Sequence, residues 1–83
     1  MITPAQGDVF RKLYTRTVNK DHCKAWAMSS LTHDQASPVI GKIKVLSKVF
    51  WEENPNEFKE IQLWGRQKIR ELGYKEEEQP KSL

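Results

Sequence analysis

The spacing of apolar residues between Leu31 and Trp51 constrains the fold of this chain more than any other feature. Apolar residues recur there at intervals of three and four, which places them on one face of an α-helix. Thr32, followed three residues later by Gln35, forms a capping box that satisfies backbone N–H groups at a helix start. The predicted face must be buried, and it consists of Ala36, Val39, Ile40, Ile43, Leu46 and Phe50.

Pro38 interrupts this pattern, because a proline inside a helix removes one backbone hydrogen bond and crowds the preceding turn. Two arrangements are compatible with it. Either a continuous helix over residues 33–52 is kinked at Pro38, or Ser37 and Pro38 restart the helix as its cap and first residue. We favour the kinked helix. Its apolar surface is broad and must contact two elements or a partner, because further apolar residues lie off the main stripe: Val45, Val49 and Trp51.

The N-terminal part of the chain predicts two more helices. Residues 3–6 repeat the capping chemistry, with a proline at the first helical position, and predict a helix over residues 4–18. Polar residues at 19–21 indicate a break. Asp21 can cap a short helix over residues 21–28.

The C-terminal part predicts a fourth helix and a tail. Residues 54–57 supply a cap, a proline and an acid that begin a helix over residues 55–72, and Gly73 can end it in a Schellman motif. Residues 75–83 are mostly polar and charged and have no apolar stripe, so we expect a disordered tail. The sequence therefore predicts an all-α bundle of four helices, one of them short, in a single domain of residues 1–74.

Composition limits the size and setting of this bundle. The chain has 83 residues, of which 37% are hydrophobic and 30% charged, and this suits one small domain with a single core. No apolar run approaches the roughly 18 residues of a membrane helix, and the first residues do not resemble a secretion signal. A lone cysteine, Cys23, fits a reducing compartment. We expect a cytoplasmic protein that is not attached to a membrane.

Few residues in the chain suggest catalysis. His22, Cys23 and His33 are the candidates for a metal ligand or a nucleophile. A structural zinc site needs about four ligands at defined spacings, and the sequence has neither a C-x-x-C nor an H-x-x-x-H pair. The glycines are isolated, so no phosphate-binding loop is indicated. We therefore expect no enzyme activity, no metal and no cofactor.

The charge distribution points to an acidic partner. Residues 1–50 contain eight Lys/Arg against three Asp/Glu, whereas residues 51–83 contain six against eight. Such an asymmetry suits the phosphates of a nucleic acid or an acidic peptide. The candidate binding residues are Arg11, Lys12, Arg16, Lys20, Lys24, Lys42, Lys44 and Lys48.

A second candidate surface is apolar. Trp51 follows the stripe residue Phe50 directly, so on a continuous helix it should point away from the buried face and be exposed. Exposed tryptophans often dominate the energetics of protein interfaces. The predicted interface, which could bind another protein or a second copy of the chain, consists of Val45, Val49, Trp51 and Leu63.

The capped helix starts at residues 2–6 and 31–37 resemble a known arrangement. Over residues 2–50 the chain is similar to the C-terminal helical module of phage single-strand annealing proteins of the Red beta type. The resemblance implies a small bundle that docks other proteins, such as a nuclease or the acidic tail of a single-stranded DNA-binding protein. We expect an accessory or inhibitory module in the DNA recombination or replication of a phage or mobile element. The alternatives are a non-specific nucleic-acid-binding protein and a structural homo-oligomer.

Overall fold

The computed structural model describes residues 1–45 and 47–77 of the chain. All regular structure in these two ranges is helical, with no strand in either, which confirms the prediction of a small all-α bundle. No described helix is both long enough and apolar enough to cross a membrane. The helices are α1 (Pro4–Arg11), α2 (Thr17–Ser30), α3 (His33–Lys44), α4 (Lys48–Glu53) and α5 (Pro55–Glu71).

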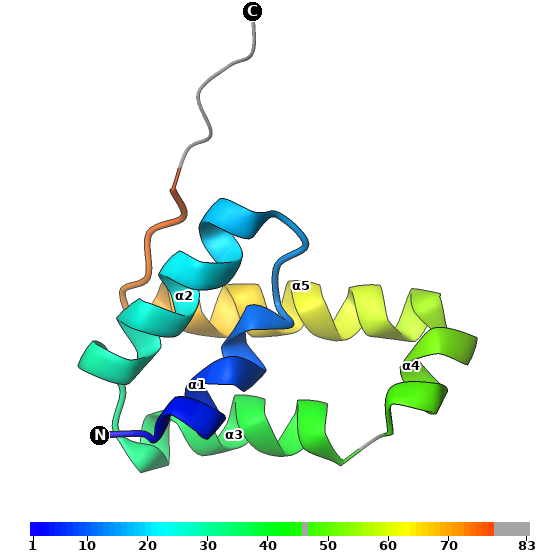
Figure 1. Ribbon diagram of the computed structural model, residues 1–83, viewed down its shortest axis with the longest axis horizontal. Coiled ribbons are helices and arrows are strands. Elements are labelled where there is room, and N and C mark those ends of the chain that lie inside the picture. Colours follow the sequence, from blue (N-terminus) through cyan, green and yellow to red (C-terminus); the bar gives the residue numbers. More distant parts are fainter. Residues whose placement is uncertain (46, 78–83) are drawn as a thin grey trace, which may run out of the picture.

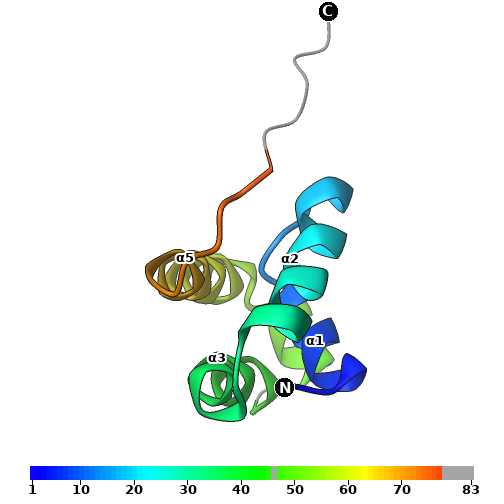
Figure 2. The same cartoon turned by 90° about the vertical axis from the view of Figure 1, so that its left-hand side faces the viewer.

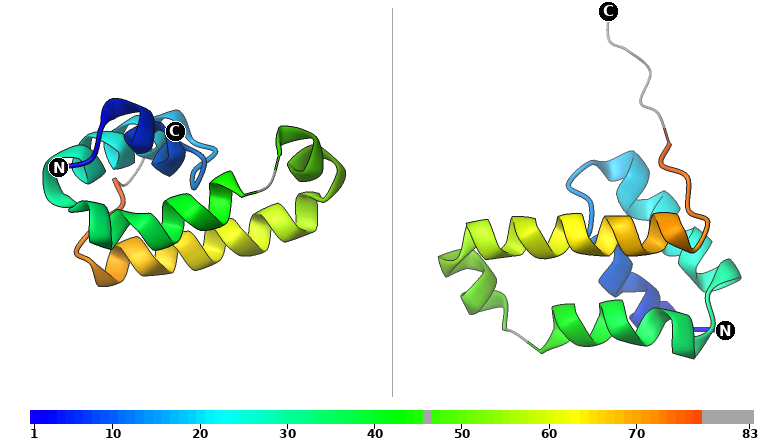
Figure 3. Two further views of the ribbon diagram at one scale, coloured as in Figure 1. Left: turned by 90° about the horizontal axis from the view of Figure 1, so that it is seen from below. Right: turned by 180° about the vertical axis from the view of Figure 1, so that it is seen from behind.

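The helices form two layers (Figures 1 and 2). α3 and α5 lie side by side and run in opposite directions in one layer, and α1 and α2 cover part of that layer from one side. The short helix α4 connects the ends of α3 and α5 that lie far from the N-terminus, as Figure 3 shows from two further sides. Because α4 lies beyond α1 and α2, this end of the molecule has fewer neighbouring helices than the other.

The predicted helix starts at Thr3 and Thr32 are confirmed. In each capping box the threonine hydroxyl accepts a hydrogen bond of 3.2 Å from the glutamine backbone N–H. The glutamine side chain accepts one from the threonine N–H, at 2.8 Å for Thr3 and 3.0 Å for Thr32. The predicted stop is also present, because Gly73 has a φ of 112° and the Tyr74 N–H donates to the Ile69 carbonyl at 2.9 Å.

The helices predicted over residues 4–18 and 21–28 are wrong in their bounds. α1 ends at Arg11, and α2 already begins at Thr17. The expected break around Asp21 therefore lies inside α2, and Asp21 caps no helix.

The loop of residues 12–16 explains this difference. Leu13 and Tyr14 lie in this loop and are buried in the core. The carbonyls of the first two loop residues accept hydrogen bonds from the side chains of Gln62, at 2.9 Å, and Arg66, at 2.6 Å. Long-range partners thus replace the helical hydrogen bonds that these carbonyls give up.

The helix predicted over residues 33–52 is two helices. α3 passes through Pro38 without restarting, so the restart alternative is wrong, and it ends at Lys44, so the continuous helix is wrong as well. The break falls instead at Ser47, whose backbone is extended and whose hydroxyl accepts a 3.1 Å hydrogen bond from the Phe50 N–H. This serine cap begins α4 in a new direction.

A single cluster of buried side chains forms the core. The predicted central stripe supplies Ala36, Val39 and Ile43, each of which is buried, whereas Leu46 lies outside the described residues. The other buried members come from the remaining parts of the chain and are Ile2, Val9, Phe10, Leu13, Tyr14, Cys23, Ala27, Leu31, Ile69 and Tyr74.

Candidate functional site

A groove runs along one face of α5, between this helix, α4 and the loop that follows α1. It consists of three adjoining hollows of about 490, 520 and 260 Å³. Phe58 lines the first two hollows and Gln62 the last two, so neighbouring hollows lie next to each other along α5. We call it the α5 groove, and its lining residues are Asp8, Arg11, Lys12, Tyr14, Thr15, Lys20, Lys48, Trp51, Glu52, Pro55, Phe58, Lys59, Gln62, Leu63 and Arg66.

The periodicity of α5 explains why one helix lines the whole groove. Its lining residues recur at steps of three and four from Pro55 to Arg66, so they share one face. Gln62 and Arg66 on that face also bond the loop carbonyls, and the Arg66 guanidinium lies 4.7 Å from the centre of the Tyr14 ring. The two walls of the groove are therefore tied together by specific contacts.

The end of the groove beside α4 is apolar. Trp51 and Phe58 pack with ring centroids 5.2 Å apart, and Pro55 lies at the same hollow. The prediction that Trp51 is exposed is wrong, because only 7% of its surface is accessible. The break at Ser47 turns α4 so that the indole packs onto α5 instead of facing solvent. Its Nε1 is buried without a hydrogen-bond partner among the described residues.

The middle of the groove is positively charged. Two of the lining cations are paired nearby: Arg11 lies 3.2 Å from Asp21 and 3.7 Å from Asp8, and Lys48 lies 3.9 Å from Glu52. Three lysines have no carboxylate within 4 Å in the ranges that the structure describes, and these are Lys12, Lys20 and Lys59.

The eight basic residues singled out from the sequence do not form one surface. Arg11, Lys12, Lys20 and Lys48 line the α5 groove, and Arg16 lines a smaller polar hollow next to it. The others lie elsewhere: Lys24 bonds Asp8 at 2.7 Å, Lys42 stacks 4.9 Å from the centre of the Trp64 ring, and Lys44 is exposed on α3.

The sequence analysis did not predict Lys59 and Arg66, through which α5 contributes positive charge to the groove. Their spacing from Phe58 and Gln62 on the helix was the available signal, because it places a basic edge beside the apolar stripe. Of the four predicted apolar interface residues, Val45, Val49 and Leu63 are 78%, 59% and 59% exposed. Only Leu63 and the buried Trp51 line the groove.

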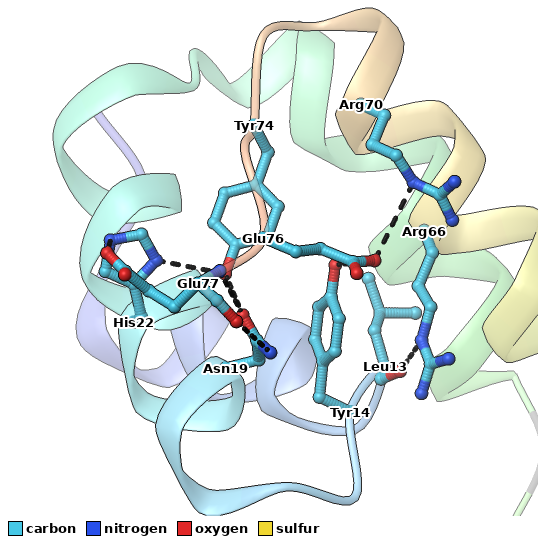
Figure 4. A network of polar contacts seen from close by, with 9 residues as sticks. All are labelled: Leu13, Tyr14, Asn19, His22, Arg66, Arg70, Tyr74, Glu76 and Glu77. Carbon is cyan, nitrogen blue, oxygen red and sulfur yellow. Dashed lines mark hydrogen bonds and ion pairs between the residues drawn. The ribbon is translucent and has the colours of Figure 1, made fainter. Parts of the chain in front are cut away.

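A second feature that the sequence did not indicate is a polar network at the C-terminal end (Figure 4). The Tyr74 hydroxyl lies 3.0 Å from His22 Nδ1 and donates to Asn19 Oδ1 at 3.2 Å. The backbone of Glu77 forms two hydrogen bonds with the Asn19 amide, of 2.7 and 3.1 Å. The Glu77 carboxylate lies 3.1 Å from His22 Nε2.

The predicted boundary between domain and tail needs correction for this reason. Residues 75–77, expected to be part of a disordered tail, lie against α2 and the end of α5. Glu76 accepts a 3.2 Å hydrogen bond from the Tyr14 hydroxyl and lies 3.8 Å from Arg70 Nε. The rest of the expected tail, residues 78–83, lies outside the described residues.

Burial suppresses ionisation in the core. Desolvation raises the pKa of the Cys23 thiol from 9.0 to about 12 and that of the Tyr74 hydroxyl from 10.0 to about 12. Burial and the neighbouring Glu76 also raise the pKa of Tyr14. Cys23 is thus held as a buried thiol, far from the thiolate form in which cysteines react. Within the described ranges, no three His, Cys, Asp or Glu residues are grouped so that they could hold a metal ion.

Comparison with known proteins finds no match for this chain among family models, curated proteins or solved structures.

Proposed function

We propose that this protein is a small non-enzymatic binding module that docks a segment of another protein in the α5 groove. The observation that carries the proposal is the apolar hollow beside Trp51 and Phe58, which adjoins three lysines that have no carboxylate partner in the described part of the chain. Binding sites for proteins and ligands combine an apolar centre with a few placed polar groups in this way.

The fixed walls of the groove support this function. Gln62 and Arg66 hold the loop after α1 against α5, so a partner would meet a surface that is already ordered. Less conformational entropy is lost on binding to such a surface, and more of the contact energy appears as affinity. The lining face of α5 spans roughly 17 Å from Pro55 to Arg66 at about 1.5 Å per residue. A short segment of chain is therefore the suitable size of ligand.

The setting that we propose is the DNA recombination or replication of a phage or mobile element. It is supported by the resemblance of residues 2–6 and 31–37 to the docking module of Red beta type annealing proteins. Candidate partners in that setting are a nuclease and a single-stranded DNA-binding protein with an acidic tail.

Quantitative affinity capture with two variants tests the docking function. Lys12→Glu with Lys59→Glu reverses two charges in the groove, and we expect it to deplete at least one protein that the wild type captures from a host lysate. Lys42→Glu with Lys44→Glu makes the same change of charge on α3, outside the groove, and should retain that protein. Identical protein profiles for wild type and groove variant would rule the docking function out.

Non-specific nucleic-acid binding is the second candidate, because the same lysines could contact phosphates. Its affinity would fall steeply with rising salt, since each phosphate contact releases counterions. A mobility-shift assay at low salt tests this alternative.

A further inference from the structure

Resting on the proposed function, we infer the chemistry of the segment that the α5 groove binds. The ligand is a short acidic segment of a partner protein that contains one large apolar side chain. That side chain inserts between α4 and α5, and the carboxylates beside it pair with lysines in the middle of the groove.

The hollow beside α4 selects an apolar group. Its lining includes Trp51 and Phe58, whose rings pack on each other, together with Pro55. Of its three charged lining residues, Lys48 and Glu52 lie 3.9 Å apart and largely cancel each other, and Lys12 lies at the border with the middle hollow. Its volume of about 490 Å³ falls within the roughly 300–1,000 Å³ that is usual for ligand sites. An aromatic or leucine side chain would be removed from water there without burying an unpaired charge.

The middle hollow selects negative charge. Lys12 and Lys20 line it and have no carboxylate within 4 Å in the described chain, whereas Arg11 is already shared between two aspartates. Lys59 extends the positive charge into the next hollow, where Arg66 lies as well. The other acids of α5 that lie nearby in sequence, Glu57 and Glu60, do not line these hollows.

The connection between the hollows fixes the order of these groups in the ligand. Lys12 and Phe58 line both the apolar and the middle hollow, so the two sites share a border. The apolar side chain and the first carboxylate must therefore be close together in the ligand. A segment with acids spread along its length and an apolar residue near one end matches the groove from α4 toward Arg66.

A nucleic acid matches these features less well. Bases bind single-strand-specific proteins by stacking on accessible aromatic rings, whereas the Trp51 ring is almost fully buried. The observations therefore favour an acidic protein segment.

Fluorescence anisotropy with designed peptides tests the inference. The probe is a labelled peptide of about 12 residues, roughly three helical turns if it folds, made of Asp, Glu and Ser with one Leu near an end. A second peptide replaces Leu by Ser, and a third replaces the acids by Lys. A labelled oligonucleotide of the same net charge completes the set. We expect the first peptide to bind at least about tenfold more tightly than each of the others.

Protein variants locate the binding. Lys12→Glu with Lys59→Glu should weaken the first peptide, and Pro55→Asp should do so while keeping a residue suited to a helix start. Lys44→Glu is the matched control, since Lys44 lies on α3 outside the groove, and it should change the affinity little. Circular dichroism of each variant checks that it is folded.

Several outcomes would overturn the inference. Equal affinity for the Leu and Ser peptides removes the apolar anchor, and tighter binding of the oligonucleotide with the same dependence on Lys12 and Lys59 assigns the groove to nucleic acid. Failure of every peptide, while lysate capture still depends on those two lysines, refutes the ligand chemistry and leaves the docking function standing. Failure of both assays removes both proposals.

Discussion

The Tyr74 hydroxyl is one of the groups that join the C-terminal segment to α2. The Tyr74 hydroxyl contacts both Asn19 and His22, and the Tyr74 ring packs 5.0 Å from the Trp26 ring, centre to centre. Asn19 is a buried polar residue, so its amide depends on this network for hydrogen bonds. The segment of residues 74–77 is thus held by polar contacts as well as by the packing of the Tyr74 ring.

Replacing Tyr74 by Phe should lower the free energy of unfolding by about 1–3 kcal/mol, because buried groups lose a partner while the ring packing is kept. Urea unfolding followed by circular dichroism measures the change. Tyr14→Phe is the matched control: it removes one hydrogen bond to the exposed Glu76 and should cost less. An equal or larger loss in the Tyr14 variant would contradict the role given to the Tyr74 hydroxyl.

At the scale of elements, the close contact between α5 and the loop after α1 positions one wall of the groove. Gly65 on α5 is buried under the Leu13 side chain, and there is no room for a Cβ atom there. Gly41 on α3 has open space where its Cβ would be. Gly65 is therefore required for close packing, whereas no contact requires a glycine at residue 41.

Gly65→Ala should destabilise the protein by about 1–3 kcal/mol, because the added methyl forces Leu13 out of a well-packed site. Gly41→Ala should instead stabilise it by about 0.5–1 kcal/mol, because alanine favours the helix and meets no neighbour. Thermal or urea unfolding of the two variants measures both effects. Stabilisation of both variants would show that helix propensity, and not packing against Leu13, decides at residue 65.

For the molecule as a whole, the buried acidic groups predict a loss of stability at alkaline pH. The pKa values of Cys23 and Tyr74 rise to about 12 in the folded chain, from 9.0 and 10.0, and that of Tyr14 is raised too. Between those values the unfolded chain releases protons that the folded chain keeps. The stabilisation is thus complete below about pH 9 and is lost as the pH rises through 12.

Urea midpoints measured from pH 7 to pH 12 check this expectation, with a reducing agent present to keep Cys23 as a thiol. We expect a decline that begins near pH 9, where the unfolded cysteine starts to ionise. Tyr74→Phe lacks one of the titrating groups and should decline less steeply above pH 10. A stability that stays constant up to pH 12 would contradict the burial of these groups.

The sequence by itself determined the helix ends whose chemistry is local. These ends are the capping boxes at Thr3 and Thr32 and the glycine stop at Gly73. Their hydrogen bonds join groups three to five residues apart, so they form without help from tertiary contacts. The apolar periodicity likewise determined the all-α class and much of the core, because an apolar helix face is buried whichever element packs against it.

Only the tertiary structure decided where the long helical segments break and which charges gather. The loop at residues 12–16 is stabilised by Gln62 and Arg66, some fifty residues away, whose side chains donate hydrogen bonds to its carbonyls. The break at Ser47 had a local cap, but the burial of Trp51 depends on Phe58 across the turn. The groove follows from both breaks, so charge counting found four of its cations and missed Lys59 and Arg66. Local hydrogen bonds are encoded in neighbouring residues, whereas a surface is set by packing between residues far apart in the chain.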